Sequence, residues 1–88
     1  MKTFTFTAAT PDGNVFQGEA VRVIVRGTEG DLAVLAGHIP FVTGVKPCKC
    51  RILLPDGTEK TGNVEGGILT VSPEAVTLLA GSFKYEES

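Results

Sequence analysis

The residues in this sequence with the clearest capacity for chemistry are one histidine and two cysteines. His38 stands in a Gly-His-Ile-Pro segment, which indicates a loop or the end of a strand. A catalytic histidine needs an orienting carboxylate and a nucleophile beside it. The sequence has no Gly-x-Ser-x-Gly turn, and Ser72 and Ser82 only neighbour a proline and a glycine. We therefore expect no catalytic residue, and expect His38 to be a partly buried loop residue that bonds to backbone.

Cys48 and Cys50 flank a single lysine, a spacing that resembles half of a metal site. Structural zinc takes four ligands, and with His38 as the only other soft ligand the set stops at three. Residues two apart on an extended strand point the same way with Cα atoms ~6.5–7 Å apart, which is poor disulfide geometry. We expect no bound metal, and two reduced thiols filling strand positions in a cytosolic protein.

The turn around Gly27 and Gly30 is too acidic to hold a phosphate. It lacks the Gly-Lys-Ser/Thr ending of a phosphate loop, carries Glu29 and Asp31, and no helix pattern follows it. The other carboxylates are scattered over turns and the tail, with no pair embedded in apolar sequence. We therefore expect no cofactor.

The elements that must carry these residues are short strands. Residues 3–8 alternate strictly, with Phe4, Phe6 and Ala8 on one face. The clearest strand covers residues 20–26, and the two Pro-Asp-Gly sequences predict turns. Further strands are expected at residues 15–17, 32–35, 41–43, 49–54, 58–64, 68–71 and 76–80. This pattern predicts an all-β antiparallel sandwich or barrel over residues 1–84, followed by a frayed polar tail over residues 85–88.

Composition narrows the classes of function further. The chain is 42% hydrophobic and 20% charged, which is typical of a globular protein. Its net charge of −2 argues against a nucleic-acid partner. Apolar runs such as Ala33–Ala36 are far shorter than the ~20 residues of a membrane-spanning helix. The start, Met1–Phe4, shows no export or import signal.

The segment from Leu35 to Val45 holds more apolar bulk than a solvated loop needs. Ile39, Phe41 and Val42 belong either to the core or to a docking patch. From the residues alone, the chain is a small β-domain that binds a partner. One form of that function is a free-standing barrel that binds a small ligand or a peptide along an edge strand.

One long segment is similar to a known family. Residues 27–40 read Gly-Thr-Glu-Gly-Asp-Leu-Ala-Val-Leu-Ala-Gly-His-Ile-Pro. This resembles Gly-Ser/Thr-Glu-Gly-Glu-Leu-Gly-Ile-Leu-Pro-Gly-His-Ala-Pro, a signature of the epsilon subunit of the F-type ATP synthase. Residues 41–47 resemble that family's Leu-Leu-Thr-Ala-Leu-Lys-Pro. Further likenesses follow in the family's order at residues 10–11, 15–20, 66–71 and 76–80.

The resemblance implies a flattened ten-stranded sandwich and a noncatalytic rotor subunit without a cofactor. Such a subunit sits between the gamma subunit and the c ring and couples proton flow to ATP synthesis. It is peripheral, held through the complex at the cytoplasmic face of the bacterial inner membrane or another energy-transducing membrane. The residues implied to face the c ring are Thr28, Glu29, Gly30 and Asp31. The residues implied to pack on gamma are His38, Ile39, Phe41, Val42 and Thr43.

The sequence departs from the family pattern at several positions. Ala33 and Ala36 stand where the family often has glycine and proline, and Cys48 stands where glycine usually follows Lys-Pro. If that glycine takes a positive φ, we expect Cys48 to be strained. Family members commonly continue into two C-terminal helices that act as a brake on ATP hydrolysis and in some members bind ATP. The sequence ends at Ser88, so those functions are not transferred to it.

Overall fold

The structure is a computed structural model that describes residues 2–86, and within this range it contains ten β-strands and no helix. The all-β prediction is therefore confirmed. The strands are β1 (Phe4–Thr10), β2 (Gly13–Ala20), β3 (Arg22–Gly27), β4 (Gly30–Leu35), β5 (Phe41–Val45), β6 (Cys48–Leu53), β7 (Glu59–Val64), β8 (Gly67–Val71), β9 (Ala75–Ala80) and β10 (Phe83–Tyr85).

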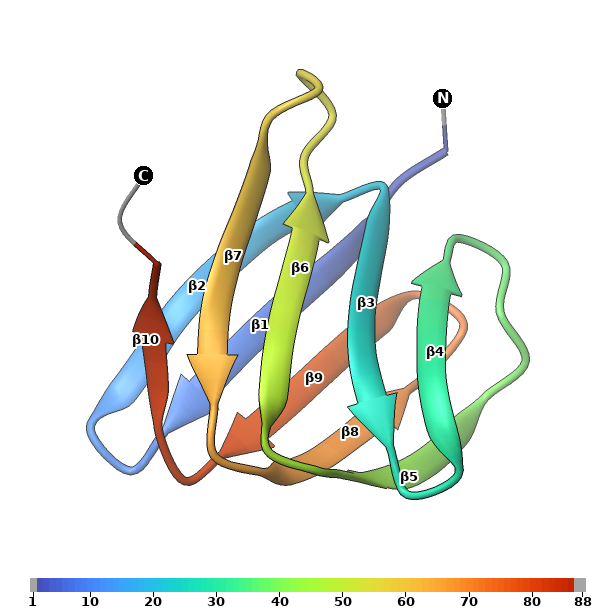
Figure 1. Cartoon of the computed structure of the whole chain (residues 1–88). Helices are drawn as coiled ribbons and strands as arrows, with labels where there is room; N and C mark the ends of the chain where they lie inside the picture. Colours follow the sequence, from blue (N-terminus) through green and yellow to red (C-terminus); the bar gives the residue numbers. More distant parts are fainter. Residues whose placement is uncertain (1, 87–88) are drawn as a thin grey trace.

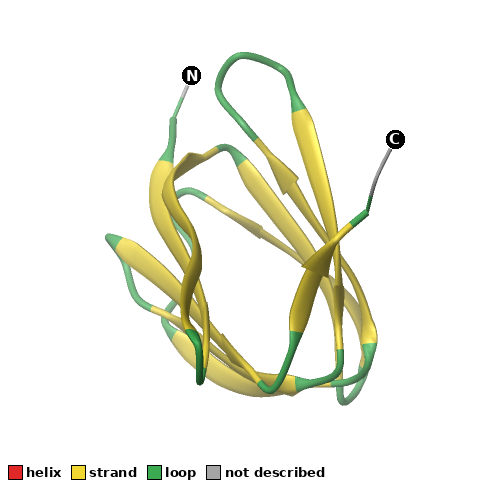
Figure 2. Ribbon diagram, turned by 90° about the vertical axis from the view of Figure 1, so that its left-hand side faces the viewer, coloured by secondary structure: helices red, strands yellow, loops and turns green. Residues whose placement is uncertain are grey.

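The strands form one sheet that folds back on itself into two layers (Figure 1). The path runs β10-β7-β6-β3-β5-β8-β9-β1-β2, with β4 added beside β3. We call β10, β7, β6, β3 and β4 the front layer, and β5, β8, β9, β1 and β2 the back layer. A single residue pair, Gly27 with Val45, joins β3 to β5 and so connects the layers. The side view shows how the chain turns between them (Figure 2).

The pairing is antiparallel throughout this path with one exception. β1 and β9 run parallel, with Phe6 opposite Val76 and Ala8 opposite Leu78. The prediction of an antiparallel sheet is thus wrong for this pair. Strand patterns in the sequence say which residues alternate, but they do not say which distant strands become neighbours.

The core lies between the two layers and is built by alternation. Phe4, Phe6 and Ala8 all point inward from β1, as the sequence predicts. Val23 and Val25 do the same from β3. Each fully buried side chain of this size contributes ~1.5–3 kcal/mol by leaving water. The largest of them are Phe6, Ile52, Leu69, Leu78, Val23, Val25, Val34 and Cys50.

Gly67, the first residue of β8, allows β8 and β9 to approach closely at one end of their hairpin. A Cβ atom at Gly67 would collide with the backbone carbonyl of Leu79 on β9. Only glycine leaves room for that carbonyl, so this position is required by packing.

The last strand is the main difference from the sequence-based elements. β10 covers Phe83–Tyr85 and pairs with β7, so the prediction of a frayed tail is wrong for Tyr85. The Tyr85 hydroxyl donates a 2.6 Å hydrogen bond to the carbonyl of Val15 on β2. This bond links the two ends of the sheet path, and Glu86 adds a backbone bond to Thr61. The strand is hard to recognise in the sequence because it has only three residues and the polar Glu86 follows it directly. Residues 87–88 of that predicted tail lie outside the described residues.

Candidate functional site

The acidic turn between β3 and β4 is a tight hairpin. Gly27 pairs with Gly30, which leaves Thr28 and Glu29 at the tip. Gly30 has a φ of 123°, a conformation that glycine adopts without strain. The methyl group of Thr28 lies against β5, since a Cβ at Gly44 would stand 3.2 Å from it. The turn is therefore held against the strand that carries Val42 and Thr43.

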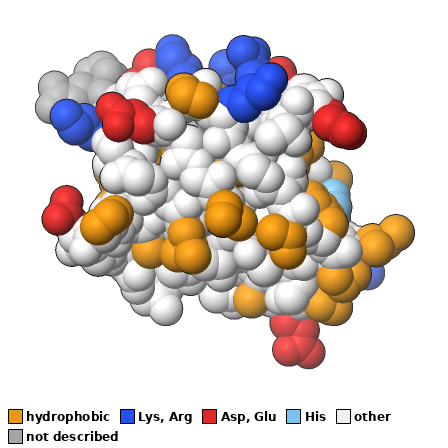
Figure 3. Space-filling model, turned by 90° about the horizontal axis from the view of Figure 1, so that it is seen from below, with side chains coloured by type: hydrophobic (Ala, Val, Ile, Leu, Met, Phe, Trp, Pro, Cys, Tyr) orange, Lys and Arg blue, Asp and Glu red, His pale blue; other side chains and the backbone are white. Residues whose placement is uncertain are grey.

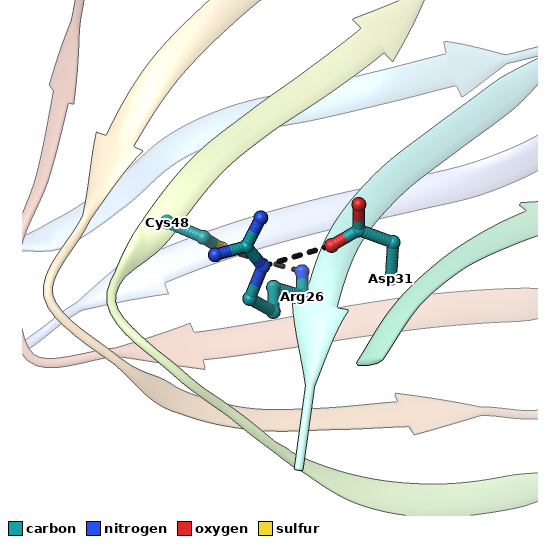
Figure 4. A network of polar contacts seen from close by, with 3 residues as sticks. All are labelled: Arg26, Asp31 and Cys48. Carbon is teal, nitrogen blue, oxygen red and sulfur yellow. Dashed lines mark hydrogen bonds and ion pairs between the residues drawn. The ribbon is translucent and has the colours of Figure 1, made fainter. Parts of the chain in front are cut away.

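Asp31, at the base of this turn, is paired within the front layer (Figure 4). The Arg26 Nε donates to the Asp31 Oδ1 at 2.9 Å, and the Arg26 backbone N–H donates to the Cys48 Sγ at 3.4 Å. The hydrogen bond to Asp31 and its negative charge raise the pKa of the Arg26 guanidinium. Both side chains of the pair are more than half exposed, so its net contribution to stability is small.

The two predicted interface segments meet at one surface hollow. Residues 27–32 and residues 41–43 together line a depression of about 480 Å³. The structure thus brings Thr28, Glu29, Gly30 and Asp31 beside Phe41, Val42 and Thr43. His38 and Ile39 do not line this hollow. They lie in the crossover from β4 to β5, where the Ile39 side chain is 81% exposed.

His38 bonds to backbone, as the sequence predicts. Its Nδ1 lies 2.9 Å from the amide nitrogen of Leu35 and 2.7 Å from the carbonyl oxygen of the same residue. The ring is half-buried and packs beside Phe41, with 6.3 Å between the ring centroids. The histidine therefore ties the crossover to the last residue of β4.

Exposed aliphatic residues extend this region across the back layer. Ile68 and Leu79 are direct cross-strand partners on β8 and β9, and both are about half exposed. Val42 lies on the same outer face of β5, two residues before the partner of Ile68. Ile39 is exposed in the crossover that leads from β4 into β5. We call Ile68, Leu79, Val42 and Ile39 the aliphatic patch; Leu35 is also exposed but lies opposite Arg22 in the front layer. Figure 3 shows hydrophobic side chains spread over the lower surface, with charged side chains near its edges.

Sequence reasoning did not identify Ile68 and Leu79 as surface residues. The signal was present, because the consecutive aliphatic pairs at 68–69 and 78–79 must point to opposite faces of a strand. One member of each pair had to face outward. That Ile68 and Leu79 meet one another, and lie near Val42, follows only from the pairing of β5, β8 and β9.

The two cysteines are free thiols on β6, as predicted. Cys50 is buried, and this burial, together with the neighbouring Cys48, raises the pKa of its thiol to about 12. No residue other than glycine has a positive φ within residues 2–86, so the strain expected at Cys48 does not occur. Cys48 also lines a second hollow of about 400 Å³ between β3 and β6, with Arg26, Lys49 and Arg51. Across the described part of the chain, no three potential metal ligands gather at one place.

No helix capable of crossing a membrane occurs among residues 2–86.

Comparison with known sequences gives a consistent result. The family model described as the beta-sandwich domain of the ATP synthase delta/epsilon chain matches residues 3–85. Two relatives named ATP synthase epsilon chain, from Psychrobacter sp. strain PRwf-1 and from Psychrobacter cryohalolentis, are each 40% identical over 80 residues. These residues are 91% of this chain and 58% of each relative, so the chain spans little more than half of their length.

Solved structures show the same fold. A chain of the Euglena gracilis mitochondrial ATP synthase, determined with OSCP, F1 and the c-ring, superimposes with a TM-score of 0.89 at 21% identity. The match covers 94% of this chain and 53% of that one. A chain from the central stalk and c-ring of the Tetrahymena thermophila mitochondrial enzyme superimposes with a TM-score of 0.75 at 12% identity. That match covers 93% of this chain and 66% of the other.

Proposed function

The chain belongs to the family of the ATP synthase delta/epsilon β-sandwich domain, and on that premise we propose that it links the gamma subunit to the c ring in the central stalk. In this role it is a noncatalytic part of the rotor that couples proton flow to ATP synthesis. It needs no cofactor. It is held through its partners at the cytoplasmic face of the bacterial inner membrane or another energy-transducing membrane.

The observation that carries the proposal is the aliphatic patch beside the acidic turn. Exposed aliphatic side chains on the outer face of a sheet bury apolar area when a protein docks, at ~25 cal/mol per Å². We assign the patch to gamma, together with His38, Phe41 and Thr43 at the β4–β5 crossover and β5. His38 contributes by fixing the crossover through its bonds to Leu35.

The acidic turn is assigned to the c ring. A two-residue hairpin tip that carries a carboxylate suits the basic and polar loops of a partner, because charge complementarity steers their association. The turn and Val42 of the patch line one hollow, so the two partners meet on neighbouring surfaces of this chain. Torque then passes through the two layers of paired strands.

Binding to purified gamma tests the proposal. Val42→Asp places a charge in the aliphatic patch, and we expect it to weaken the complex by at least about tenfold, because the charge loses water on docking. Asn63→Asp adds the same charge at an exposed position on β7 in the front layer and serves as the matched control. A wild-type chain that forms no complex with gamma at micromolar concentration would contradict the proposal.

The alternative of a free-standing ligand-binding barrel has no observation in its favour. Small-molecule sites are mostly apolar and bury most of the ligand surface. The two hollows described above have charged residues in their walls.

A further inference from the structure

We propose that Glu29 alone supplies the charge with which the acidic turn selects a cationic partner loop, because Arg26 neutralises Asp31. The inference rests on the proposed function, in which this turn faces the c ring. The sequence pattern assigns recognition of a cationic loop to Glu29 and Asp31 equally, whereas this inference assigns it to Glu29.

Glu29 is the free charge of the turn. It stands at the tip of the hairpin closed by Gly27 and Gly30, and it is exposed. Among residues 2–86, the ion pairs are Arg22 with Glu59, Arg26 with Asp31, and Lys49 with Glu86, so Glu29 has no cationic partner. An unpaired carboxylate at a protruding tip attracts an approaching cation without competition from its own protein.

Asp31 is different although it lies only two residues away. Its Oδ1 is 2.9 Å from the Arg26 Nε, so a cation that approaches Asp31 also approaches a guanidinium. At the distance of a docking loop, the charges of Asp31 and Arg26 largely cancel. Arg26 projects from β3, and the pair therefore keeps the Asp31 carboxylate turned toward the front layer (Figure 4).

The other side of the turn is occupied as well. Thr28 lies against Gly44 of β5, and its side chain therefore supports the hairpin. With Asp31 paired, Glu29 is the one charged side chain of the turn that is free to meet a partner. The hollow beneath it, lined by residues 27–32 and 41–43, suits a partner loop with a lysine or arginine at its tip.

Two variants test the division of roles. Glu29→Gln removes the free charge of the turn, whereas Arg26→Gln/Asp31→Asn removes both members of the ion pair and leaves the net charge unchanged. We measure association of the full chain with detergent-solubilised c ring at low and at physiological ionic strength. Glu29→Gln is expected to slow association about tenfold at low ionic strength and to remove most of the salt dependence. Arg26→Gln/Asp31→Asn is expected to change the rate by less than about twofold, because the two charges that it removes already cancel at the distance of a docking loop.

A double variant tests the part played by Arg26. If Arg26 only supports the fold, adding Arg26→Gln to Glu29→Gln leaves association unchanged or slower. If Arg26 neutralises Asp31, the added change frees that carboxylate. Association of the double variant should then rise about threefold above that of Glu29→Gln, with renewed salt dependence. Thermal unfolding of each variant confirms that it is folded.

The inference is overturned if Arg26→Gln/Asp31→Asn slows association as much as Glu29→Gln does, or if adding Arg26→Gln to Glu29→Gln brings no recovery. Wild-type chain that does not bind the c ring under any of these conditions overturns the c-ring assignment of the proposed function as well. The two failures are distinct, because the first appears only in the variants and the second already appears in the wild type.

Discussion

The outer faces of the two layers differ far more in the charge of their side chains than their inner faces do. The front layer carries Arg22, Arg26, Lys49 and Arg51 outward, and all three ion pairs of residues 2–86 lie on it. The outer face of the back layer carries threonine, valine, isoleucine and leucine, and Glu19 is the one charged residue among its outward strand positions. Even Glu19 accepts hydrogen bonds from Thr3 and Thr5, at 3.0 Å each.

This difference separates a hydrated surface from one that loses water at low cost. Removing paired charges from water is expensive, and charged residues are depleted in the centres of protein interfaces. Threonine and aliphatic side chains carry no such penalty when a partner covers them. The outer face of the back layer is therefore better suited to docking than the charged strand positions of the front layer are.

The largest expected effect comes from the core that both layers share. Phe6 is fully buried and packs beside Phe16, with ring centroids 5.7 Å apart. Phe6→Ala should lower the free energy of unfolding by about 3–5 kcal/mol, through lost burial and the cavity that remains. Thr7→Ala, one residue along β1 and outward-facing, should change it by less than about 0.5 kcal/mol. If the two variants lost equal unfolding free energy in denaturant, the inner and outer faces of β1 would not differ in burial.

A pH titration tests whether the inside of the front layer is dry beneath its charged surface. The thiol of Cys50 has its pKa raised from 9.0 to about 12 by burial, with Cys48 adding to the shift. The folded state therefore disfavours the thiolate relative to the unfolded chain. This contribution to stability is fully present below pH 9 and is lost as the pH rises toward about 12.

Cys50→Val is the control, because valine is apolar, similar in size and does not titrate. The stability of wild type should fall more steeply than that of the variant between pH 9 and about 12, measured by denaturant unfolding. Parallel curves for the two proteins would show that water reaches Cys50. Alkylation offers a second measurement, since half-buried Cys48 should react with iodoacetamide well before Cys50.

The smallest expected effect concerns the ion pairs of the front layer. The Nη2 of Arg22 lies 3.8 Å from the Oε2 of Glu59, and the two side chains are 40% and 39% exposed. Arg22→Gln should lower the free energy of unfolding by less than about 1 kcal/mol, and the difference should shrink in high salt. Binding to gamma should not change. A loss of gamma binding in this variant would mean that the front layer belongs to that interface and that the contrast between the two faces has been misread.

Much of the fold was predictable because alternation is a local property. The residues that face inward from β1 and β3 follow directly from their spacing, as does the turn at Gly27–Gly30. The missed strand β10 shows the limit of that reasoning. It is too short for alternation to stand out, and it is held by buried Phe83, by pairing with β7 and by the bond from Tyr85 to Val15, which are 70 residues apart.

The candidate site was predictable only in part for the same reason. Its two segments, at residues 28–31 and 38–43, were recognisable from their residues. Their shared hollow, the outward position of Ile68 and Leu79, and the pairing of Asp31 with Arg26 were not. Each of these depends on which strands become neighbours or on which of two nearby carboxylates meets a cation.

By itself, the sequence determined that this protein is a sandwich of short strands with an uncharged core and an acidic turn. Side-chain periodicity and turn chemistry act over a few residues, so both can be read along the chain. Tertiary structure alone decided that β1 lies parallel to β9, that the charges gather on one outer face, and that Glu29 has no ion-pair partner among residues 2–86. Those outcomes arise from contacts between residues far apart in the chain, and they exist only once the layers have packed.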